Sequence, residues 1–171
     1  MNPSVLPNHL IIAPILIPLV AGAIMLFYND RNRQTKLVMG LVAVGLMFLS
    51  SVELMSDAKE LGAAGGAIVQ LYRLGDWPVP IGIVLVLDRL SAMMVMLTAL
   101  LAAPSLIYAA AGWHGKGQHY HSMFQFLLAG VNGSFLTGDL FNLFVFFEVM
   151  LAASYGLMLH GSGAARVKAG L

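Results

Sequence analysis

Five apolar stretches, each long enough to cross a lipid bilayer or nearly so, dominate this sequence of 171 residues. A helix needs about 20 mostly apolar residues to span a hydrocarbon core about 30 Å thick. The stretches cover approximately residues 10–28, 37–54, 88–111, 121–137 and 140–160. They predict an all-α integral membrane protein with about five transmembrane helices, organised as a single membrane domain over residues 1–171.

The composition argues against other classes of protein. Hydrophobic residues make up 59% of the chain and charged residues 10%, whereas a soluble domain has about 45–50% and about 25%. These values argue against a soluble enzyme, and also against disorder, because disordered segments are poor in apolar residues. The net charge of +1 indicates no nucleic-acid partner. Without cysteine the chain has no disulfides or thiolate metal sites, and we expect no metal and no cofactor.

Basic residues between the stretches predict the orientation. Residues 1–8 hold no Lys or Arg, whereas a basic cluster in 29–36 follows the first stretch. A secretory signal has the opposite polarity, so we predict a retained span. If 29–36 is cytoplasmic, 112–120 and 161–171 are too, and these three segments hold six of the nine basic residues. The positive-inside rule then places the N-terminus outside and the C-terminus inside, in the inner (plasma) membrane.

The segment between the second and third stretches is too long and too polar for a tight turn. Two β-branched-rich runs, AIVQLYRL (67–74) and IVLVLD (83–88), flank the turn-forming cluster GDWPVPIG (75–82), which is a hairpin signal. We predict a small extracytoplasmic β-hairpin at about 67–87. The alternative is that 81–87 forms the first turns of the third helix.

Glu148 points most directly to a function. It lies eight positions into the fifth stretch, about 12 Å below the membrane surface and close to mid-bilayer. A charge there costs at least about 2.5–3.5 kcal/mol, so such a residue by default marks an ion or proton path. Because hydrocarbon favours the neutral carboxyl and a nearby cation favours the charged one, Glu148 is predicted to bind and release protons. The alternative is a permanently protonated glutamate that donates one interhelical hydrogen bond.

No other acid or base is predicted to lie deep in a span, so the partner of Glu148 is expected to come from another subunit or another part of the polypeptide. Asp139 is predicted to cap the fifth helix, and ion entry beside Asn142 is the alternative. Asp88 suits the start of the third helix. Arg89 is predicted to snorkel or to pair with an acid such as Asp139 or one on a partner subunit.

The fourth stretch carries small and polar residues. Gly130 and Gly133 let helices approach closely in lipid, and Asn132 is predicted to hydrogen-bond across that contact. A hydrated path lined by Asn132 and Ser134 is the alternative. The first stretch contains Pro14 and Pro18, which membrane helices tolerate where neighbours re-satisfy the freed carbonyls.

Histidines cluster before the fourth stretch in GWHGKGQHYH (112–121). His119 and His121 are two residues apart and no carboxylate is close in sequence, which is a poor arrangement for a metal. We predict an inner-face loop, with cytoplasmic proton collection as the alternative. His160, at the end of the fifth stretch, suits a helix C-terminus.

Two segments resemble a known family. FLTGDLFNLFVFFEVMLAASYGLMLHGSGAARVKAGL (135–171) resembles the fourth-to-fifth helix region of the D subunit of Mrp-type multisubunit cation/proton antiporters. WPVPIGIVLVLDRLSAMMV (77–95) is similar to the segment that leads into that subunit's third helix. The superfamily also includes the antiporter-like proton-pumping subunits of respiratory complex I and of membrane hydrogenases. The TGDLFNLFVFFE block is the most specific part of the resemblance.

The resemblance implies that Glu148 belongs to the central ion-translocation axis and pairs with a membrane-embedded lysine on a later helix. Members have about fourteen helices with inverted repeats, a known transporter design. The chain is therefore expected to be the N-terminal part of a longer subunit.

We expect an ion-translocating subunit, not an enzyme, that works with other antiporter subunits and uses proton flow to expel Na⁺ or K⁺. The alternatives are a proton-pumping subunit of a complex I-like NADH:quinone oxidoreductase or membrane hydrogenase, and a scaffold in which Glu148 merely packs.

Overall fold

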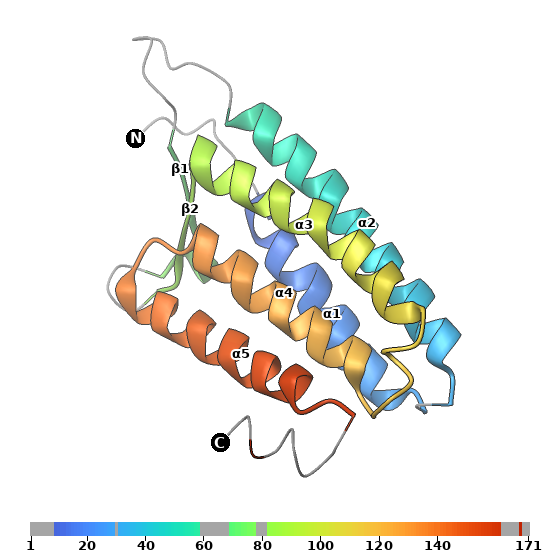
Figure 1. The fold of residues 1–171 in the computed structure, drawn as a ribbon. Helices are drawn as coiled ribbons and strands as arrows, with labels where there is room; N and C mark the ends of the chain where they lie inside the picture. The colour runs from blue at the N-terminus through green and yellow to red at the C-terminus, as the bar shows by residue number, and fades with distance from the viewer. Residues whose placement is uncertain (1–8, 30, 59–68, 78–81, 162–167, 169–171) are drawn as a thin grey trace.

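The computed structural model describes residues 9–29, 31–58, 69–77, 82–161 and 168. Five α-helices run alongside one another, and two short strands lie at one end (Figure 1). The helices are α1 (Ala13–Phe27), α2 (Arg33–Asp57), α3 (Arg89–Ala110), α4 (Tyr120–Leu136) and α5 (Leu140–Met158). The other elements are the 3-10 turns η1 (His9–Ile12) and η2 (Leu74–Asp76) and the strands β1 (Gln70–Arg73) and β2 (Val84–Leu87).

Four of the described helical segments are long and apolar enough to cross a membrane, namely His9–Phe27, α2, α3 and α5. The sequence predicts about five spans, and the difference is α4. This helix has 17 residues, so it is about 26 Å long at 1.5 Å per residue, slightly less than a hydrocarbon core. The chain is thus mostly helical, with the apolar helices of a multi-pass membrane protein.

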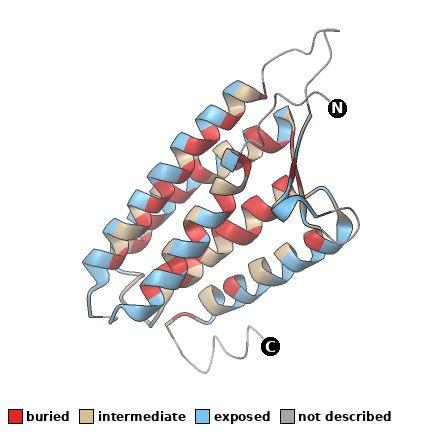
Figure 2. Cartoon of the chain, turned by 180° about the vertical axis from the view of Figure 1, so that it is seen from behind, coloured by how far each residue is buried: buried red, intermediate tan, exposed pale blue. Residues whose placement is uncertain are grey.

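The first four helices form a bundle in which α1 and α3 each contact both α2 and α4. α5 lies at the edge of this bundle and packs against α4 (Figure 1). Buried residues gather where α1 to α4 face one another, whereas most of α5 is exposed (Figure 2). Only 11% of the most apolar window of α5 is buried within the chain. Most of the α5 surface is therefore left uncovered by the described residues.

Two apolar clusters fill the bundle. One lies near the strands and includes Leu54, Leu85 and Leu136. The other lies farther along the helices and includes Val44, Leu106 and Leu128. Helices α2, α3 and α4 contribute to both clusters, and α4 also contacts α1 and α5.

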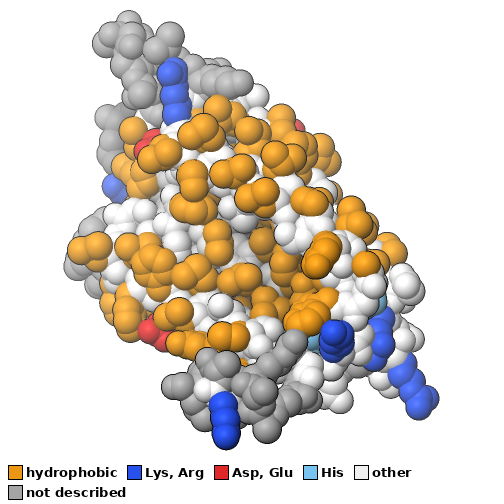
Figure 3. All heavy atoms as spheres, in the orientation of Figure 1, with side chains coloured by type: hydrophobic (Ala, Val, Ile, Leu, Met, Phe, Trp, Pro, Cys, Tyr) orange, Lys and Arg blue, Asp and Glu red, His pale blue; other side chains and the backbone are white. Residues whose placement is uncertain are grey.

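The exterior is also apolar. Hydrophobic side chains cover most of the face seen in Figure 3, and Lys and Arg lie toward the ends of the helices. Exposed large side chains include Val20 on α1, Leu49 on α2, Leu100 on α3 and Phe144 on α5. A water-soluble protein rarely exposes so much contiguous apolar surface, whereas a lipid-facing one must.

The strands β1 and β2 pair antiparallel, with Gln70 opposite Leu87 and Arg73 opposite Val84. The helical alternative for 81–87 is therefore wrong for the described part, because Val84–Leu87 is a strand and α3 begins at Arg89. Residues 67, 68 and 78–81 of the predicted hairpin lie outside the described residues.

The strand pair is tied to the α4–α5 connection. The Gly138 amide donates to the Val84 carbonyl over 2.8 Å, and Leu85 forms an isolated bridge with Thr137. A Cβ at Gly138 would lie 2.6 Å from the Val86 side chain, so only glycine allows this approach. These contacts fix the start of α5, the helix that carries Glu148.

Candidate functional site

Glu148 is the ninth of the 19 residues of α5, halfway along the helix. Its side chain is exposed in the described chain. The neighbouring Phe144, Phe147 and Leu151 are exposed as well. The carboxylate thus belongs to an apolar face of α5 that the described residues leave open.

The start of α5 is held by a side-chain cap. Asp139 accepts a hydrogen bond from the Asn142 amide over 2.8 Å, which confirms the predicted N-cap. The Asn142 side-chain amide also donates to the second carboxylate oxygen of Asp139. Both residues are therefore engaged with each other in the first turn of the helix, where a negative charge is favourable.

The start of α3 has a reciprocal cap. Asp88 accepts from the Ser91 amide over 2.6 Å, and the Ser91 hydroxyl accepts from the Asp88 amide over 2.9 Å. The predicted role of Asp88 at this N-terminus is confirmed. Arg89 donates from Nε to the Ala58 carbonyl over 3.1 Å, so it ties α3 to the end of α2.

Ser134 and Asn132 lie on different sides of α4. The Ser134 hydroxyl donates to the Gly130 carbonyl over 2.9 Å, and the residue borders a cavity of about 360 Å³ that Asp88 and Ser91 also line. Asn132 is fully buried and points instead toward α1 and α2. The described residues therefore do not bring the two into one path.

Asn132 closes a hydrogen-bonding gap in α1. Because Pro18 has no N–H, it cannot bond to the Pro14 carbonyl four residues earlier. The Asn132 side-chain amide donates to that carbonyl over 2.8 Å and also contacts the Met47 sulfur at 3.0 Å. The interhelical bond predicted for Asn132 is thus present, and its partners lie on α1 and α2.

Gln125, which is not among the residues predicted from the sequence, is also fully buried. Its side-chain amide donates to the Gly40 carbonyl of α2 over 3.3 Å. The sequence feature that could have identified Gln125 is its position seven residues before Asn132. This spacing places both amide side chains on one side of a helix.

Two glycines of α4 let α5 approach closely, as predicted. A Cβ at Gly130 would lie 2.8 Å from the Met150 amide nitrogen, and one at Gly133 would collide with the Phe146 ring. The backbones of α4 and α5 are therefore nearly in contact, as small residues allow in membrane helices. Through this contact the bundle positions the helix that carries Glu148.

The end of the bundle away from the strands carries a histidine cluster. His114 Nδ1 lies 3.1 Å from His121 Nε2, and His160 Nε2 lies 3.2 Å from the Trp113 carbonyl oxygen. The Tyr120 ring contacts the rings of both His121 and His160. His160 lies far from the other histidines in sequence, and only the fold brings the end of α5 to the loop before α4.

Burial lowers the pKa of His114 below its ordinary 6.5, and the charges of Arg33 and His160 lower it further. The loop histidine therefore favours the neutral form. Among the described residues, no group of three or more acidic, histidine or cysteine side chains could hold a metal ion.

Lys36 requires a correction. The sequence placed it in a loop before a span beginning at about residue 37, but α2 begins at Arg33 and Lys36 lies in its first turn. The side chain is 2% exposed and lies close enough to His121 for its charge to act on that ring. A hydropathy pattern counts lysine as polar and ends the stretch before it, although a lysine stem packs well against apolar neighbours.

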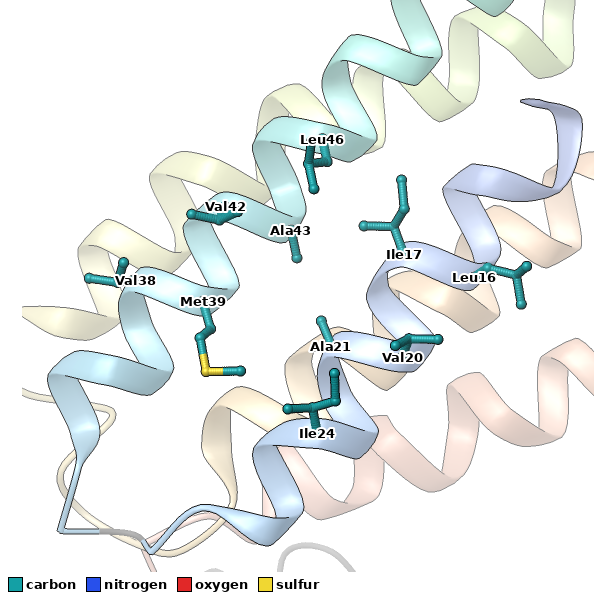
Figure 4. Close-up of a pocket in the computed structure, with 10 residues that line it drawn as sticks. All are labelled: Leu16, Ile17, Val20, Ala21, Ile24, Val38, Met39, Val42, Ala43 and Leu46. Atoms are coloured by element: carbon teal, nitrogen blue, oxygen red, sulfur yellow. The ribbon is translucent and has the colours of Figure 1, made fainter. Parts of the chain in front are cut away.

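An apolar groove runs between α1 and α2 and has a volume of about 520 Å³. Figure 4 shows Ile17, Ala21 and Ile24 of α1 opposite Met39, Ala43 and Leu46 of α2. Its described lining contains no charged or hydrogen-bonding side chain. The groove therefore offers no side chain that could bind an ion.

Curated relatives align with almost the whole chain. It is 55% identical over 167 residues to a protein of Rhizobium meliloti that is named as the probable D subunit of a K(+)/H(+) antiporter. It is 42% identical over 156 residues to the D subunit of a Na(+)/H(+) antiporter of Alkalihalophilus pseudofirmus. These alignments cover 96% and 90% of the chain but 30% of each relative. The chain resembles the N-terminal part of the D subunit of K⁺/H⁺ and Na⁺/H⁺ antiporters. No family model matches it.

Solved structures agree with this similarity. The chain matches a chain of the Mrp complex from Dietzia sp. with a TM-score of 0.78 and 30% identity, covering 95% of this chain and 30% of that one. It also shares the fold of a chain of an archaeal membrane-bound sulfane sulfur reductase, with a TM-score of 0.75 and 21% identity over 94% of this chain and 31% of that one. The chain thus spans about a third of each of these solved chains.

Proposed function

We propose that this chain is part of an ion-translocating membrane subunit of a multisubunit monovalent cation/proton antiporter, which uses proton flow to expel Na⁺ or K⁺. Glu148 would be its proton-binding carboxylate. The D-subunit relatives support the class of transporter. The observation that carries the assignment of Glu148 is its position halfway along α5, on a face that the described residues leave open.

The open face of α5 explains how a single carboxylate could take part in transport. If lipid covered it, charging Glu148 would cost at least about 2.5–3.5 kcal/mol. If later helices of the subunit cover it with a lysine, the cation offsets that cost and the carboxylate can switch between charge states. The chain covers 30% of its relatives, so those proteins have ample further sequence for such a cover.

The membrane arrangement is part of the proposal. All five helices would span the inner membrane, with α4 packed inside the bundle where its shorter length is tolerated. The strand pair would lie on the extracytoplasmic side, because Arg31, Arg33 and Lys116 lie at the opposite end, which the positive-inside rule assigns to the cytoplasm. Other antiporter subunits and the bilayer would be its partners.

The remaining site residues have more local roles in this proposal. Asp139 and Asn142 would order the first turn of α5. An ion that entered beside them would do so at the outer end of that helix. Asp88 and Arg89 would fix the start of α3. Ser134 would line the cavity beside Asp88, on the side of α4 away from Asn132.

The experiment that tests the proposal measures cation-dependent proton flux in membrane vesicles that contain the assembled complex. Glu148→Gln should abolish flux, because it removes the titrating group while keeping the size of the side chain. Glu53→Gln, the same change on the exposed outer part of α2, is the matched control and should transport normally. Normal flux in Glu148→Gln, with the complex assembled, would exclude Glu148 from the mechanism.

A second candidate is a proton-pumping subunit of a complex I-like oxidoreductase or membrane hydrogenase. This candidate is compatible with the fold that the chain shares with a chain of the archaeal respiratory membrane complex. Its discriminating test is the driving force. Flux that requires NADH and quinone would favour the redox complex, whereas flux driven by a pH gradient and alkali cations favours the antiporter.

A further inference from the structure

A pocket with a volume of about 550 Å³, which we call the basic pocket, lies at the end of the bundle away from the strands. Asn29, Arg31 and Arg33, from the turn between α1 and α2, line one side of it. Residues 115–118 of the loop between α3 and α4, which include Lys116, line the other. The described lining contains no acidic side chain. Three cations therefore converge on one space from two segments that are far apart in sequence.

Local structure places two of these cations against the loop between α3 and α4. Gly115 has no side chain, and a Cβ there would lie 2.8 Å from Arg33 Nη1, so glycine allows the guanidinium to reach the loop. The Lys116 ammonium lies 4.7 Å from the centre of the Trp113 ring, which is a cation–π distance. The two positive groups thus belong to the same part of the pocket, although they come from different segments.

The charges in the pocket favour binding of an anion. Like charges gathered in one place repel one another, and an anion bound among them replaces repulsion with attraction. Residues 29–36 and 112–120 together hold four Lys or Arg residues and one acid, Asp30, which lies outside the described residues. The positive-inside rule explains basic residues at this end, but not why two segments direct them at one pocket. Because arginine binds phosphate through parallel N–H groups, a phosphate is the anion that fits best.

The apolar groove between α1 and α2 begins close to the basic pocket. Its residues nearest to the turn are Ile24 of α1 and Val38 of α2 (Figure 4). Each lies five residues from the pocket lining, which is about 8 Å at 1.5 Å per residue. From there the groove extends eight residues along each helix, to Leu16 and Leu46, which is about 12 Å. It therefore lies at a depth of about 8 to 20 Å below the pocket.

This depth matches the acyl chains of one leaflet. A headgroup region is about 5–8 Å deep, and the hydrocarbon of one leaflet below it is about 15 Å thick. The groove lining is apolar, and several of its side chains, including Val20 and Val42, are exposed on the outside of the bundle. A molecule with a phosphate at one end and a hydrocarbon chain at the other would therefore fit the pocket and the groove together.

We propose that the basic pocket and the groove bind an anionic phospholipid of the cytoplasmic leaflet. Its phosphate lies among Arg31, Arg33 and Lys116, and one acyl chain lies between α1 and α2. Basic pockets at the cytoplasmic ends of membrane helices bind lipid headgroups of this kind. The inference rests on the membrane orientation proposed above, but not on the role of Glu148.

Photo-cross-linking of the assembled complex in phosphatidylcholine vesicles tests the proposal. The vesicles contain a trace of phosphatidylglycerol or of phosphatidylcholine with a photoreactive group midway along one acyl chain, and mass spectrometry identifies the labelled peptides. We expect the anionic lipid to label residues 16–24 and 38–46 several-fold more than the zwitterionic lipid. Equal labelling by the two lipids would overturn the proposal. Absence of labelling by both would also overturn it, because protein would then cover the groove.

Variants separate the headgroup from the chain. Arg31→Gln combined with Lys116→Gln should remove the preference for the anionic lipid, whereas Arg73→Gln, the same type of change on strand β1 at the other end, should keep it. Ala21→Phe should reduce labelling of the groove several-fold, because the larger side chain fills the space of the acyl chain. Glu148→Gln should leave labelling unchanged, so failure of this proposal is distinguishable from failure of the transport proposal.

Two results with these assembled proteins would contradict the proposal. One is a preference for the anionic lipid that persists in the double variant. The other is loss of the preference in wild type when inorganic phosphate is added but not when sodium chloride is added at the same ionic strength, because the pocket would then bind a free anion.

Discussion

The bond between Asn132 and α1 makes a prediction that two substitutions can isolate. Pro18 leaves the Pro14 carbonyl without its helical donor, and Asn132 supplies the replacement over 2.8 Å. Asn132→Leu keeps a side chain of similar size but leaves this carbonyl unpaired, which costs about 1–3 kcal/mol. Pro18→Ala restores an N–H that can bond to the same carbonyl within α1. In the Pro18→Ala background, Asn132→Leu should therefore lose this cost.

The assay is thermal unfolding of the purified assembled protein in a double-mutant cycle. The other effects of Asn132→Leu, including removal of its unpaired Oδ1, occur in both backgrounds and cancel. The expected coupling is about 1–3 kcal/mol, well above the deviation of about 0.3–0.5 kcal/mol seen for independent sites. Pro104→Ala is the matched control, because that proline lies in α3 and should not couple. Equal costs of Asn132→Leu in the wild-type and Pro18→Ala backgrounds would show that Asn132 does not replace the donor that α1 lacks at Pro18.

Three further predictions concern packing, capping and protonation. Gly130→Val should destabilise the protein by about 1–3 kcal/mol because a side chain there meets the α5 backbone, whereas Gly45→Val, which meets nothing within 4 Å, should be tolerated in thermal unfolding. Asp139→Ala should cost about 0.5–2 kcal/mol of stability through loss of the cap, and Asp139→Asn should recover most of it; equal stability of Asp139→Ala and the wild type would exclude the capping role. An NMR titration of His114 should give a midpoint below 6.5, and Arg33→Gln should raise it. Since the folded state lowers this pKa, the stability that His114 contributes is present above pH 6.5 and is lost as the pH falls below it. A midpoint at or above 6.5 would contradict the burial of that ring.

Hydropathy and capping patterns predict the apolar helices and their N-terminal caps, because both depend on residues that are close in sequence. The caps by Asp88 and Asp139 follow from a carboxylate placed directly before an apolar stretch, and both are present. The start of α2 was misplaced because Lys36 reads as polar, although its side chain is buried against the bundle. Hydropathy scores each residue type by its average surroundings. It therefore cannot predict a lysine whose aliphatic carbons pack against apolar neighbours.

Local sequence patterns could not predict which residues on different helices contact one another. Asn132 was predicted to bond across a helix contact, but its partners Pro14 and Met47 are 118 and 85 residues away in sequence. The meeting of His160 with Trp113 likewise depends on α5 returning along α4. The buried amide of Gln125 was missed for the same reason, because nothing in its own segment specifies which helix it faces.

Glu148 is proposed to take up and release a proton in the middle of the membrane as the complex exchanges cations. Infrared difference spectroscopy of the assembled complex, recorded on addition of Na⁺ or K⁺, measures this change most directly. We expect a carboxyl band that changes with the cation and is absent in Glu148→Gln, while Glu53→Gln keeps it. A cation-induced spectrum that is identical in Glu148→Gln and the wild type would contradict the claim.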